Sequence, residues 1–212
     1  MLAARLAPTY QGKPCAVVAL SDGGAVVGAQ IASQLHCVLT LLLTEKVSLP
    51  NEPVAVGGVL STGAFAYNSA YSAGELEEIN SEYHGVIEQE KFTKFRKLNA
   101  LVGSSETIDR NLLEGRNVIL VSDAFEGTFP IDMAMEFMKP IPSTRVVVAT
   151  PLSDVVAIDR MHISADEICC LSVVENLMEA DHYYDKNDVP EHQHIIDTIE
   201  QIMQHWNGAK TI

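Results

Sequence analysis

The sequence has little positive charge and lacks long apolar runs. Its 28 Asp and Glu residues outnumber its 14 Lys and Arg residues, so the formal net charge is −14 at pH 7. A polyanion of this kind repels nucleic acid and anionic membranes at long range, and neither is an expected partner. No apolar run reaches the roughly 18 residues that a membrane-spanning helix needs. Met1 to Pro8 also lack the apolar core of a secretion signal, so we expect a cytoplasmic protein.

Cysteine pairs with metal-binding or redox spacing are missing as well. The cysteines lie inside apolar runs without a CxxC motif, at Cys15, Cys37, Cys169 and Cys170. We therefore expect reduced thiols in the core. The chain also shows no internal repeat and no low-complexity tract. With 212 residues, of which 47% are hydrophobic and 20% charged, it is predicted to form one domain over residues 1–212.

Short apolar runs alternate with amphipathic segments of helix length. This pattern predicts an α/β fold with a mostly parallel central sheet flanked by helices. Because the runs are continuously apolar, the strands are expected to be covered on both faces. The expected strands are Cys15–Leu20, Cys37–Leu43, Val118–Val121, Arg145–Thr150 and Ile168–Val173.

A small β-hairpin and two further helices complete the predicted fold. Two strand-like stretches within Val54–Asn68 flank Ser61-Thr62-Gly63, which is a turn composition. From Gly74 to about Asn99 acidic residues come first and basic residues last, which suits the helix dipole and predicts a long exposed helix. Asp188-Val189-Pro190-Glu191 introduces a last helix. Its apolar side chains at helical spacing predict a core-facing stripe of Ile195, Ile196, Ile199, Ile202, Met203 and Trp206.

The first functional signal is a loop with two glycines, Ser21-Asp22-Gly23-Gly24. It follows an expected strand and precedes a helix predicted for Ala25–Leu35. This geometry cradles phosphate, because bare backbone approaches a ligand closely and the first amides of a helix are unpaired. The same composition also occurs in tight turns that bind nothing.

The second signal is the loop Ser122 to Thr128, which follows the strand that ends at Val121. Pro130 lies in the first turn of a helix predicted for Pro130–Met138, where its missing amide hydrogen costs nothing. The sequence thus predicts a second loop between a strand and a helix at the carboxyl end of a strand, which is where ligands of open α/β sheets bind. Asp123 is equally a residue that caps turns, and both roles stay open at this point.

From about Lys13 to Trp206 the sequence resembles the type I phosphoribosyltransferases. Their signature is an apolar strand that ends in two adjacent acidic residues and continues through small residues into Thr-Gly at the start of a helix. The resemblance is closest to a stand-alone bacterial branch and rests on Glu45-Lys46-Val47, Pro50-Asn51-Glu52-Pro53 and Gly57-Gly58-Val59. It implies that the acidic pair holds the ribose of phosphoribosyl pyrophosphate. The amides that follow would hold the 5′-phosphate, and the earlier loop, with magnesium, the pyrophosphate.

The resemblance places each of these roles on residues of this chain. The acidic pair falls on Ser122 and Asp123, which are the predicted catalytic positions. The 5′-phosphate would be held by Ala124, Phe125, Glu126, Gly127 and Thr128. The pyrophosphate would be held by Ser21, Asp22, Gly23, Gly24 and Lys46. Lys46 is also compatible with a solvated lysine after a strand.

Several positions depart from the family pattern toward negative charge. Of the acidic pair only Asp123 is an acid, and the Thr-Gly step appears in reverse order as Gly127-Thr128. In the first loop Ser21-Asp22 replaces Pro-Arg, and Glu45 replaces the arginine before Lys46. Reversing a charge about 4 Å from a phosphate costs several kcal/mol near a protein surface.

Two acidic side chains are expected to compete with the phosphate directly. Glu126 stands inside the second loop, where small neutral residues are usual, and Asp132 follows in the first turn of the helix. Both would present carboxylates to the amino end of that helix, which is the position of an incoming phosphate. We therefore expect the loop to be partly occupied by the protein itself.

Other site types fit the sequence less well. Ser21 and Ser122 lack a Gly-x-Ser-x-Gly elbow and a nearby histidine, so they are not predicted nucleophiles. Asp22-Gly23-Gly24 lacks the three-glycine spacing of dinucleotide-binding folds. No metal site is predicted near the carboxyl end, because residues two apart on a helix do not share a face. The residues concerned there are His182, His192 and His194 with Asp181 and Asp185.

Two functions follow from the resemblance. As an enzyme, the chain would transfer a ribose phosphate from phosphoribosyl pyrophosphate to a nitrogenous acceptor, with Mg²⁺ as cofactor. As a non-catalytic descendant, it would bind a small phosphorylated sugar or nucleotide in a binding or regulatory role. The second function is what a preserved core with altered loops predicts. A homodimer is implied in either case.

Overall fold

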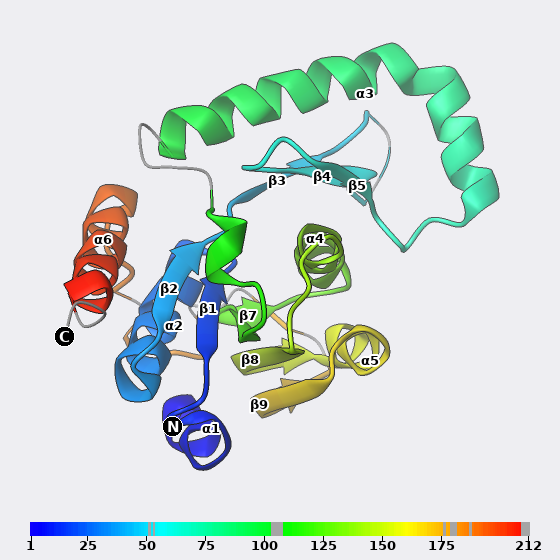
Figure 1. Cartoon of the computed structure of the whole chain (residues 1–212). Helices are drawn as coiled ribbons and strands as arrows, with labels where there is room; N and C mark the ends of the chain where they lie inside the picture. The colour runs from blue at the N-terminus through cyan, green and yellow to red at the C-terminus, as the bar shows by residue number, and fades with distance from the viewer. Residues whose placement is uncertain are drawn as a thin grey trace.

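The computed structural model describes residues 1–50, 52, 54–102, 108–175, 177–178, 182–186 and 188–208, without the side chains of residues 102 and 204–208. Within these residues six strands form a central sheet and three form a smaller sheet beside it (Figure 1). The predicted α/β fold is confirmed. Some residues used in the predictions lie outside the described part, namely Asn51, Pro53, Asp181 and the side chain of Trp206.

The central sheet is parallel, with the order β2-β1-β6-β8 and with β9 on the other side of β8. All five expected strands are present. Their bounds are β1 Cys15–Ala19, β2 Val38–Leu41, β6 Asn117–Val121, β8 Arg145–Asp154 and β9 Glu167–Val174.

One additional short strand, β7 (Ala124–Phe125), lies where only a loop is predicted. It pairs with Leu152 and Ser153 of β8, in the register that β6 already has with β8. β7 is therefore a continuation of β6 after a break of two residues, Ser122 and Asp123.

Helices cover both faces of the central sheet (Figure 1). α1 (Leu2–Tyr10), α2 (Asp22–Leu35) and α6 (His192–Gly208) lie on one face, and α4 (Phe129–Met138) and α5 (Val155–Ser164) on the other. Adjacent strand residues point to opposite faces. Val17 and Ile119 pack in the cluster with α1, α2 and α6, and Val18 and Leu120 pack in the cluster with α4 and α5. The sequence patterns give no bounds for α1 or α5.

The small sheet is antiparallel, with the order β3-β4-β5, and the predicted hairpin is its β4–β5 part. Its strands are β3 (Thr44–Val47), β4 (Gly57–Leu60) and β5 (Phe65–Tyr67). The predicted long helix is α3 (Ala73–Val102), which lies over this sheet and forms a separate core cluster with it. A 3-10 turn, η1 (Arg110–Leu112), precedes the return to β6.

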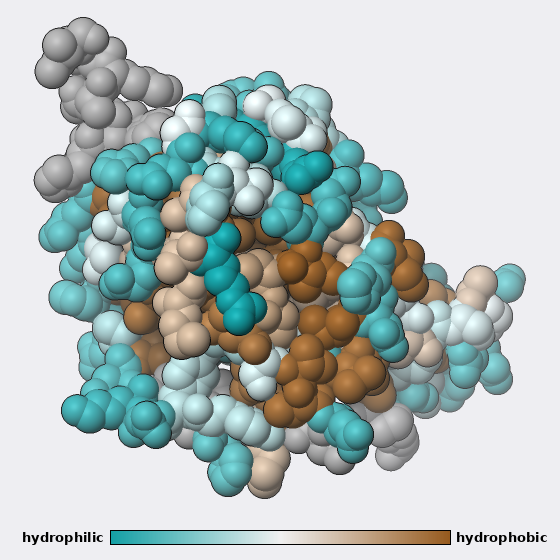
Figure 2. Space-filling view, turned by 90° about the horizontal axis from the view of Figure 1, so that it is seen from below, coloured by the Kyte–Doolittle hydropathy of each residue, from teal (hydrophilic) through white to brown (hydrophobic). Residues whose placement is uncertain are grey.

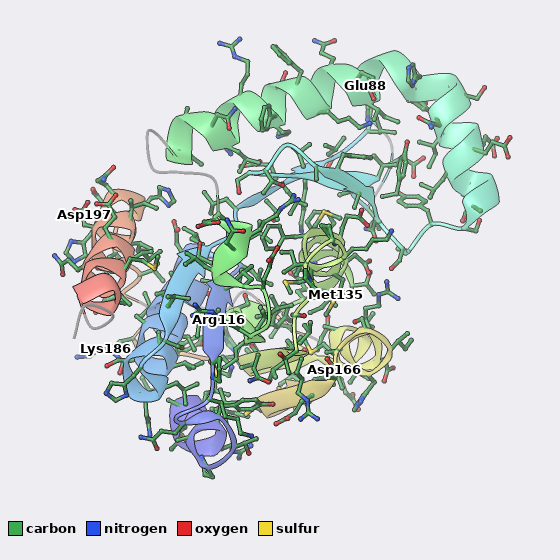
Figure 3. All side chains as sticks on the ribbon, viewed as in Figure 1. Glu88, Arg116, Met135, Asp166, Lys186 and Asp197 are labelled. Carbon is green, nitrogen blue, oxygen red and sulfur yellow. The ribbon has the colours of Figure 1, made fainter. Side chains whose placement is uncertain are left out.

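Charged side chains cover the outer helices, whereas one face of the molecule is more apolar. Glu88 on α3 and Asp197 on α6 are exposed (Figure 3). Seen from below, apolar side chains gather on part of the surface (Figure 2). The exposed apolar side chains of α5 and β9 include Val156, Ile163 and Val173. No helix in the described residues is long and apolar enough to cross a membrane.

Candidate functional site

The two predicted loops meet at the carboxyl edge of the central sheet. They follow β1 and β6, which are adjacent parallel strands, so both leave the sheet at the same edge. The Ser21 hydroxyl donates a hydrogen bond to Oδ1 of Asp123 over 2.6 Å. The same hydroxyl accepts the amide of Gly24 over 2.8 Å and thereby caps α2. Ser21 therefore links the start of α2 to the end of β6.

Both glycines of the first loop allow this close contact. The carboxylate of Asp123 lies against Gly23, and a side chain at Gly23 would overlap it. A Cβ on Gly24 would stand 2.8 Å from the carbonyl oxygen of Val121 and 3.0 Å from the Cα of Ser122. The close packing of one loop on the other thus explains why both positions are glycine. Their contact with a phosphate stays a prediction.

Ser122 stabilises the break between β6 and β7. Its side chain is buried, and its hydroxyl lies 2.8 Å from the carbonyl oxygen of Ala124 and 3.2 Å from Oδ1 of Asp123. Ala124 and Phe125 then enter β7, and the Phe125 side chain is fully buried. The open part of the second loop is therefore shorter than the sequence predicts and consists of Glu126 to Thr128.

A carboxylate does occupy this loop, but it comes from another strand. Oδ2 of Asp154, at the end of β8, accepts the amide of Gly127 over 2.8 Å, and Oδ1 accepts the amide of Ala157 over 2.6 Å. Asp154 therefore caps α5 and holds the second loop with the same side chain. The expected occupant, Glu126, is exposed to solvent instead. Gly127 has a φ of 64°, a conformation that glycine adopts without strain.

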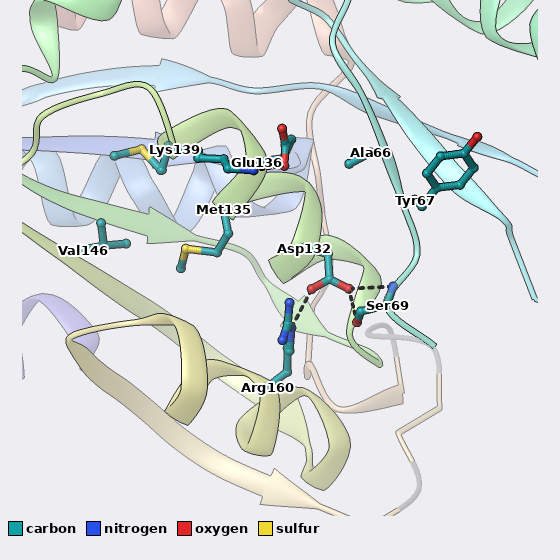
Figure 4. A pocket seen from close by; sticks show the side chains of 10 residues that line it. Ala66, Tyr67, Ser69, Asp132, Met135, Glu136, Lys139, Val146 and Arg160 are labelled. Carbon is teal, nitrogen blue, oxygen red and sulfur yellow. Dashed lines mark hydrogen bonds and ion pairs between the residues drawn. The ribbon is translucent and has the colours of Figure 1, made fainter. Parts of the chain in front are cut away.

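Asp132, the other expected competitor, is bound by side chains from other parts of the fold (Figure 4). It is only 7% exposed, and Oδ1 accepts a hydrogen bond from Nε of Arg160 on α5 over 2.6 Å. Its Oδ2 accepts from the hydroxyl of Ser69 over 2.6 Å. Both oxygens are therefore engaged, and the Ser69 hydroxyl also lies 3.4 Å from the hydroxyl of Thr128, the residue before α4. Competition of the Asp132 carboxylate with a phosphate stays a prediction. A cavity of about 440 Å³ opens beside the pair.

The small sheet contacts the second loop at two points. The hydroxyl of Thr128 lies 3.4 Å from Oδ1 of Asn68, which follows β5. Nζ of Lys46 on β3 lies 5.6 Å from the ring centre of Phe129 at the start of α4. Glu45 points to the opposite side of β3, where its carboxylate pairs with Lys97 over 2.5 Å. The acid at that position is thus balanced by α3, and Lys46 is the side chain near the loop.

The chain is similar in sequence to curated proteins. No protein-family model matches the chain. Two curated proteins of Mycobacterium tuberculosis named "Putative phosphoribosyl transferase", Rv0571c of strain H37Rv and MT0597 of strain CDC 1551, are each 25% identical to it over 172 residues. The aligned part is 81% of this chain and 38% of each relative, so the chain spans well under half of their length. The chain is phosphoribosyltransferase-like.

A solved structure agrees with this comparison over nearly the whole chain. The protein TT1426 from Thermus thermophilus has a TM-score of 0.68 and 25% sequence identity. The match covers 97% of the phosphoribosyltransferase-like chain and 93% of TT1426. The match therefore extends over the small sheet and both loops as well as the central sheet.

Three side chains near the phosphoribosyltransferase-like loops are missed by the sequence analysis. Besides Asp154, these are Tyr184, which lies between β9 and α6, and His192, the first residue of α6. The Tyr184 hydroxyl donates to the main-chain oxygen of Asp123 over 2.7 Å. Nδ1 of His192 lies 2.8 Å from Oδ1 of Asp22. The Asp before Val155 carries a helix-cap signature, whereas neither Tyr184 nor His192 lies in a motif.

Magnesium is implied by the family resemblance, and the described side chains alone do not form a site for it. No group of three His, Cys, Asp or Glu side chains in the described part of the chain converges as metal ligands do. The Asp123 carboxylate is held by Ser21, and Asp22 is paired with His192. A magnesium ion at this edge would therefore depend on oxygens of the ligand.

Proposed function

We propose that the carboxyl edge formed by the two loops binds a phosphorylated sugar or nucleotide. The contact between Ser21 and Asp123 carries this proposal, because it joins the two loops that the phosphoribosyltransferase resemblance assigns to pyrophosphate and ribose. The similarity to curated proteins named as phosphoribosyl transferases supports it. The amides of Glu126 to Thr128 would hold the 5′-phosphate, and Lys46 with Ser21 to Gly24 the pyrophosphate.

The reaction that suits such a ligand is transfer of the ribose phosphate to a nitrogenous acceptor. The bond between the anomeric carbon and a pyrophosphate oxygen breaks, and pyrophosphate leaves with the bonding electrons. A ring nitrogen of the acceptor forms the new bond to the same carbon. This chemistry needs positioning of two reactants more than covalent help from side chains. Asp123 would orient the ribose, and the two loops would hold the phosphates apart.

A second candidate is binding without turnover, and the hydrogen bond from Gly127 to Asp154 favours it. The amide assigned to the 5′-phosphate already donates to a carboxylate over 2.8 Å. A phosphate at the same amide must displace this carboxylate or accept its repulsion. The net charge of −14 adds to the unfavourable field. Such a site would bind a polyphosphate weakly or turn it over slowly.

The two candidates are separated by measuring binding and turnover on the same samples. Thermal shift with phosphoribosyl pyrophosphate and Mg²⁺ measures binding, and release of pyrophosphate with a panel of purines, pyrimidines and amines measures turnover. Asp123→Asn tests the site, and Asp159→Asn on the exposed side of α5 is the control. Release that is lost in Asp123→Asn alone supports transfer. A thermal shift without release supports the binding module, and no shift at millimolar ligand contradicts both.

A homodimer belongs to the same proposal, since the resemblance implies it. Sedimentation velocity at several protein concentrations tests it. A single species of twice the mass of one 23.1 kDa chain is the expected result. A monomer throughout the concentration series contradicts it.

A further inference from the structure

Two side chains that follow β9 in the sequence, Tyr184 and His192, contact the edge that carries the two loops. β9 lies at one end of the sheet order, and α6 packs against α2 and β2 at the other (Figure 1). β9 is parallel to the other strands, so it ends at their carboxyl edge. α6 begins at His192, beside Asp22 at the start of α2.

Tyr184 contacts the second loop, and His192 contacts the first loop. Tyr184 donates to the main-chain oxygen of Asp123 over 2.7 Å, between β6 and β7. Burial, and then the negative charge of Asp123, raises the pKa of the Tyr184 phenol to about 12, so the hydroxyl keeps its proton at neutral pH. His192 pairs with the carboxylate of Asp22 over 2.8 Å, and its Nε2 is buried.

We infer that Tyr184 and His192 are positioning residues of the ligand site, so that this site is built from the two loops, Tyr184 and the first residue of α6. Tyr184 holds the peptide between Asp123 and Ala124, which aims the amides of the second loop. His192 holds the Asp22 carboxylate toward α6, so its charge is turned from the amides of Gly23 and Gly24. The expected effect on ligand binding rests on the proposed function. The contacts of Tyr184 and His192 with the two loops are present without ligand.

The effect on binding is tested by calorimetric titration of phosphoribosyl pyrophosphate with Mg²⁺. Tyr184→Phe keeps the ring and removes the donor, and we expect about fivefold weaker binding, the value of one ordinary hydrogen bond. Tyr71→Phe is the matched control, because its hydroxyl also donates to a main-chain oxygen, that of Val54 over 2.8 Å. Equal affinities of Tyr184→Phe and Tyr71→Phe would overturn the role of Tyr184.

A double variant tests the role of His192. His192→Ala should weaken binding by a few-fold, because Asp22 is then able to face the phosphate. Adding Asp22→Asn to His192→Ala should restore the lost affinity, since the released charge is gone. His194→Ala, an exposed position of the same helix, is the control. A double variant as weak as His192→Ala would contradict the inference.

Amide hydrogen exchange without ligand separates this inference from the proposed function. Tyr184→Phe should raise exchange at residues 122–128 and leave residues 73–102 unchanged, whereas Tyr71→Phe should not affect 122–128. If wild-type protein binds no phosphorylated ligand, the proposed function fails and the exchange result still decides whether Tyr184 holds the second loop. Unchanged exchange at residues 122–128 in Tyr184→Phe would overturn the positioning role of Tyr184.

Discussion

The first and second loops of the site have the same place in the fold and different partners. After β1 the chain turns at once into α2, and the amide of Gly24 is accepted by the neutral hydroxyl of Ser21. After β6 the chain continues as β7, and the amide of Gly127 is accepted by the carboxylate of Asp154. A phosphate bound as we propose would therefore meet a neutral partner at one loop and a negative one at the other.

This difference concerns the hydrogen bonds that support the carboxyl edge of a phosphoribosyltransferase-like fold. The loops support each other through Ser21 and Asp123, and the second loop is also tied to α5 by Asp154. Hydrogen bonds that a ligand would supply are thus made by the protein. Under the proposed function, such replacement would stabilise the edge without ligand and lower its affinity for phosphate.

The largest expected effect comes from pushing the two loops apart. Gly24→Ala would place a Cβ 2.8 Å from the carbonyl oxygen of Val121, so the backbone of one loop must move. We expect a loss of about 2–3 kcal/mol in the free energy of unfolding, as for overpacked sites. Gly85→Ala is the control, since nothing lies within 4 Å of its Cβ position in α3, and it should stabilise by about 0.5–1 kcal/mol. Urea unfolding measures both, and equal stabilities would break the comparison.

The support behind the second loop is tested at the pair of Arg160 and Asp132. Arg160→Met leaves the buried Asp132 carboxylate with Ser69 alone, and we expect a loss of about 2 kcal/mol. Arg145→Met breaks the more exposed pair with Glu167, where about 0.5 kcal/mol is expected. Thermal unfolding of the two variants compares them. A loss at Arg145→Met as large as at Arg160→Met would show that the buried pair has no special role.

The neutral partner of the first loop gives a smaller effect. Ser21→Ala removes a helix cap and the hydrogen bond to Asp123, and we expect a loss of about 1.5 kcal/mol. Ser72→Ala at α3 is the control, because Ser72 bonds only to its own helix start, at Glu75. Its expected loss is about 0.5–1 kcal/mol. Chemical denaturation of both, with Asp123→Ala as a third variant, shows whether the excess depends on Asp123.

The strands of the fold follow from the sequence better than the contacts of the site do. Apolar runs such as Val118–Val121 are long enough to predict buried parallel strands, and the acid-to-base order predicts α3. β7 is missed because two residues carry too little pattern, and its pairing depends on β8. Asp154, Tyr184 and His192 are missed because tertiary contacts bring them to the loops from distant segments. Glu126 is nearer in sequence to Gly127 than Asp154 is, but the extended β7 leaves its side chain in solvent.

The most direct test of the account is calorimetric titration of phosphoribosyl pyrophosphate with Mg²⁺ into wild-type protein and Asp154→Asn. Asparagine keeps a cap for α5 and removes the charge beside Gly127, whose amide Asp154 accepts over 2.8 Å in the wild type. We predict binding to both proteins at 1:1 stoichiometry and about tenfold tighter binding to Asp154→Asn. No binding to either protein, or equal affinity for both, would contradict a phosphate site in which Asp154 holds the second loop.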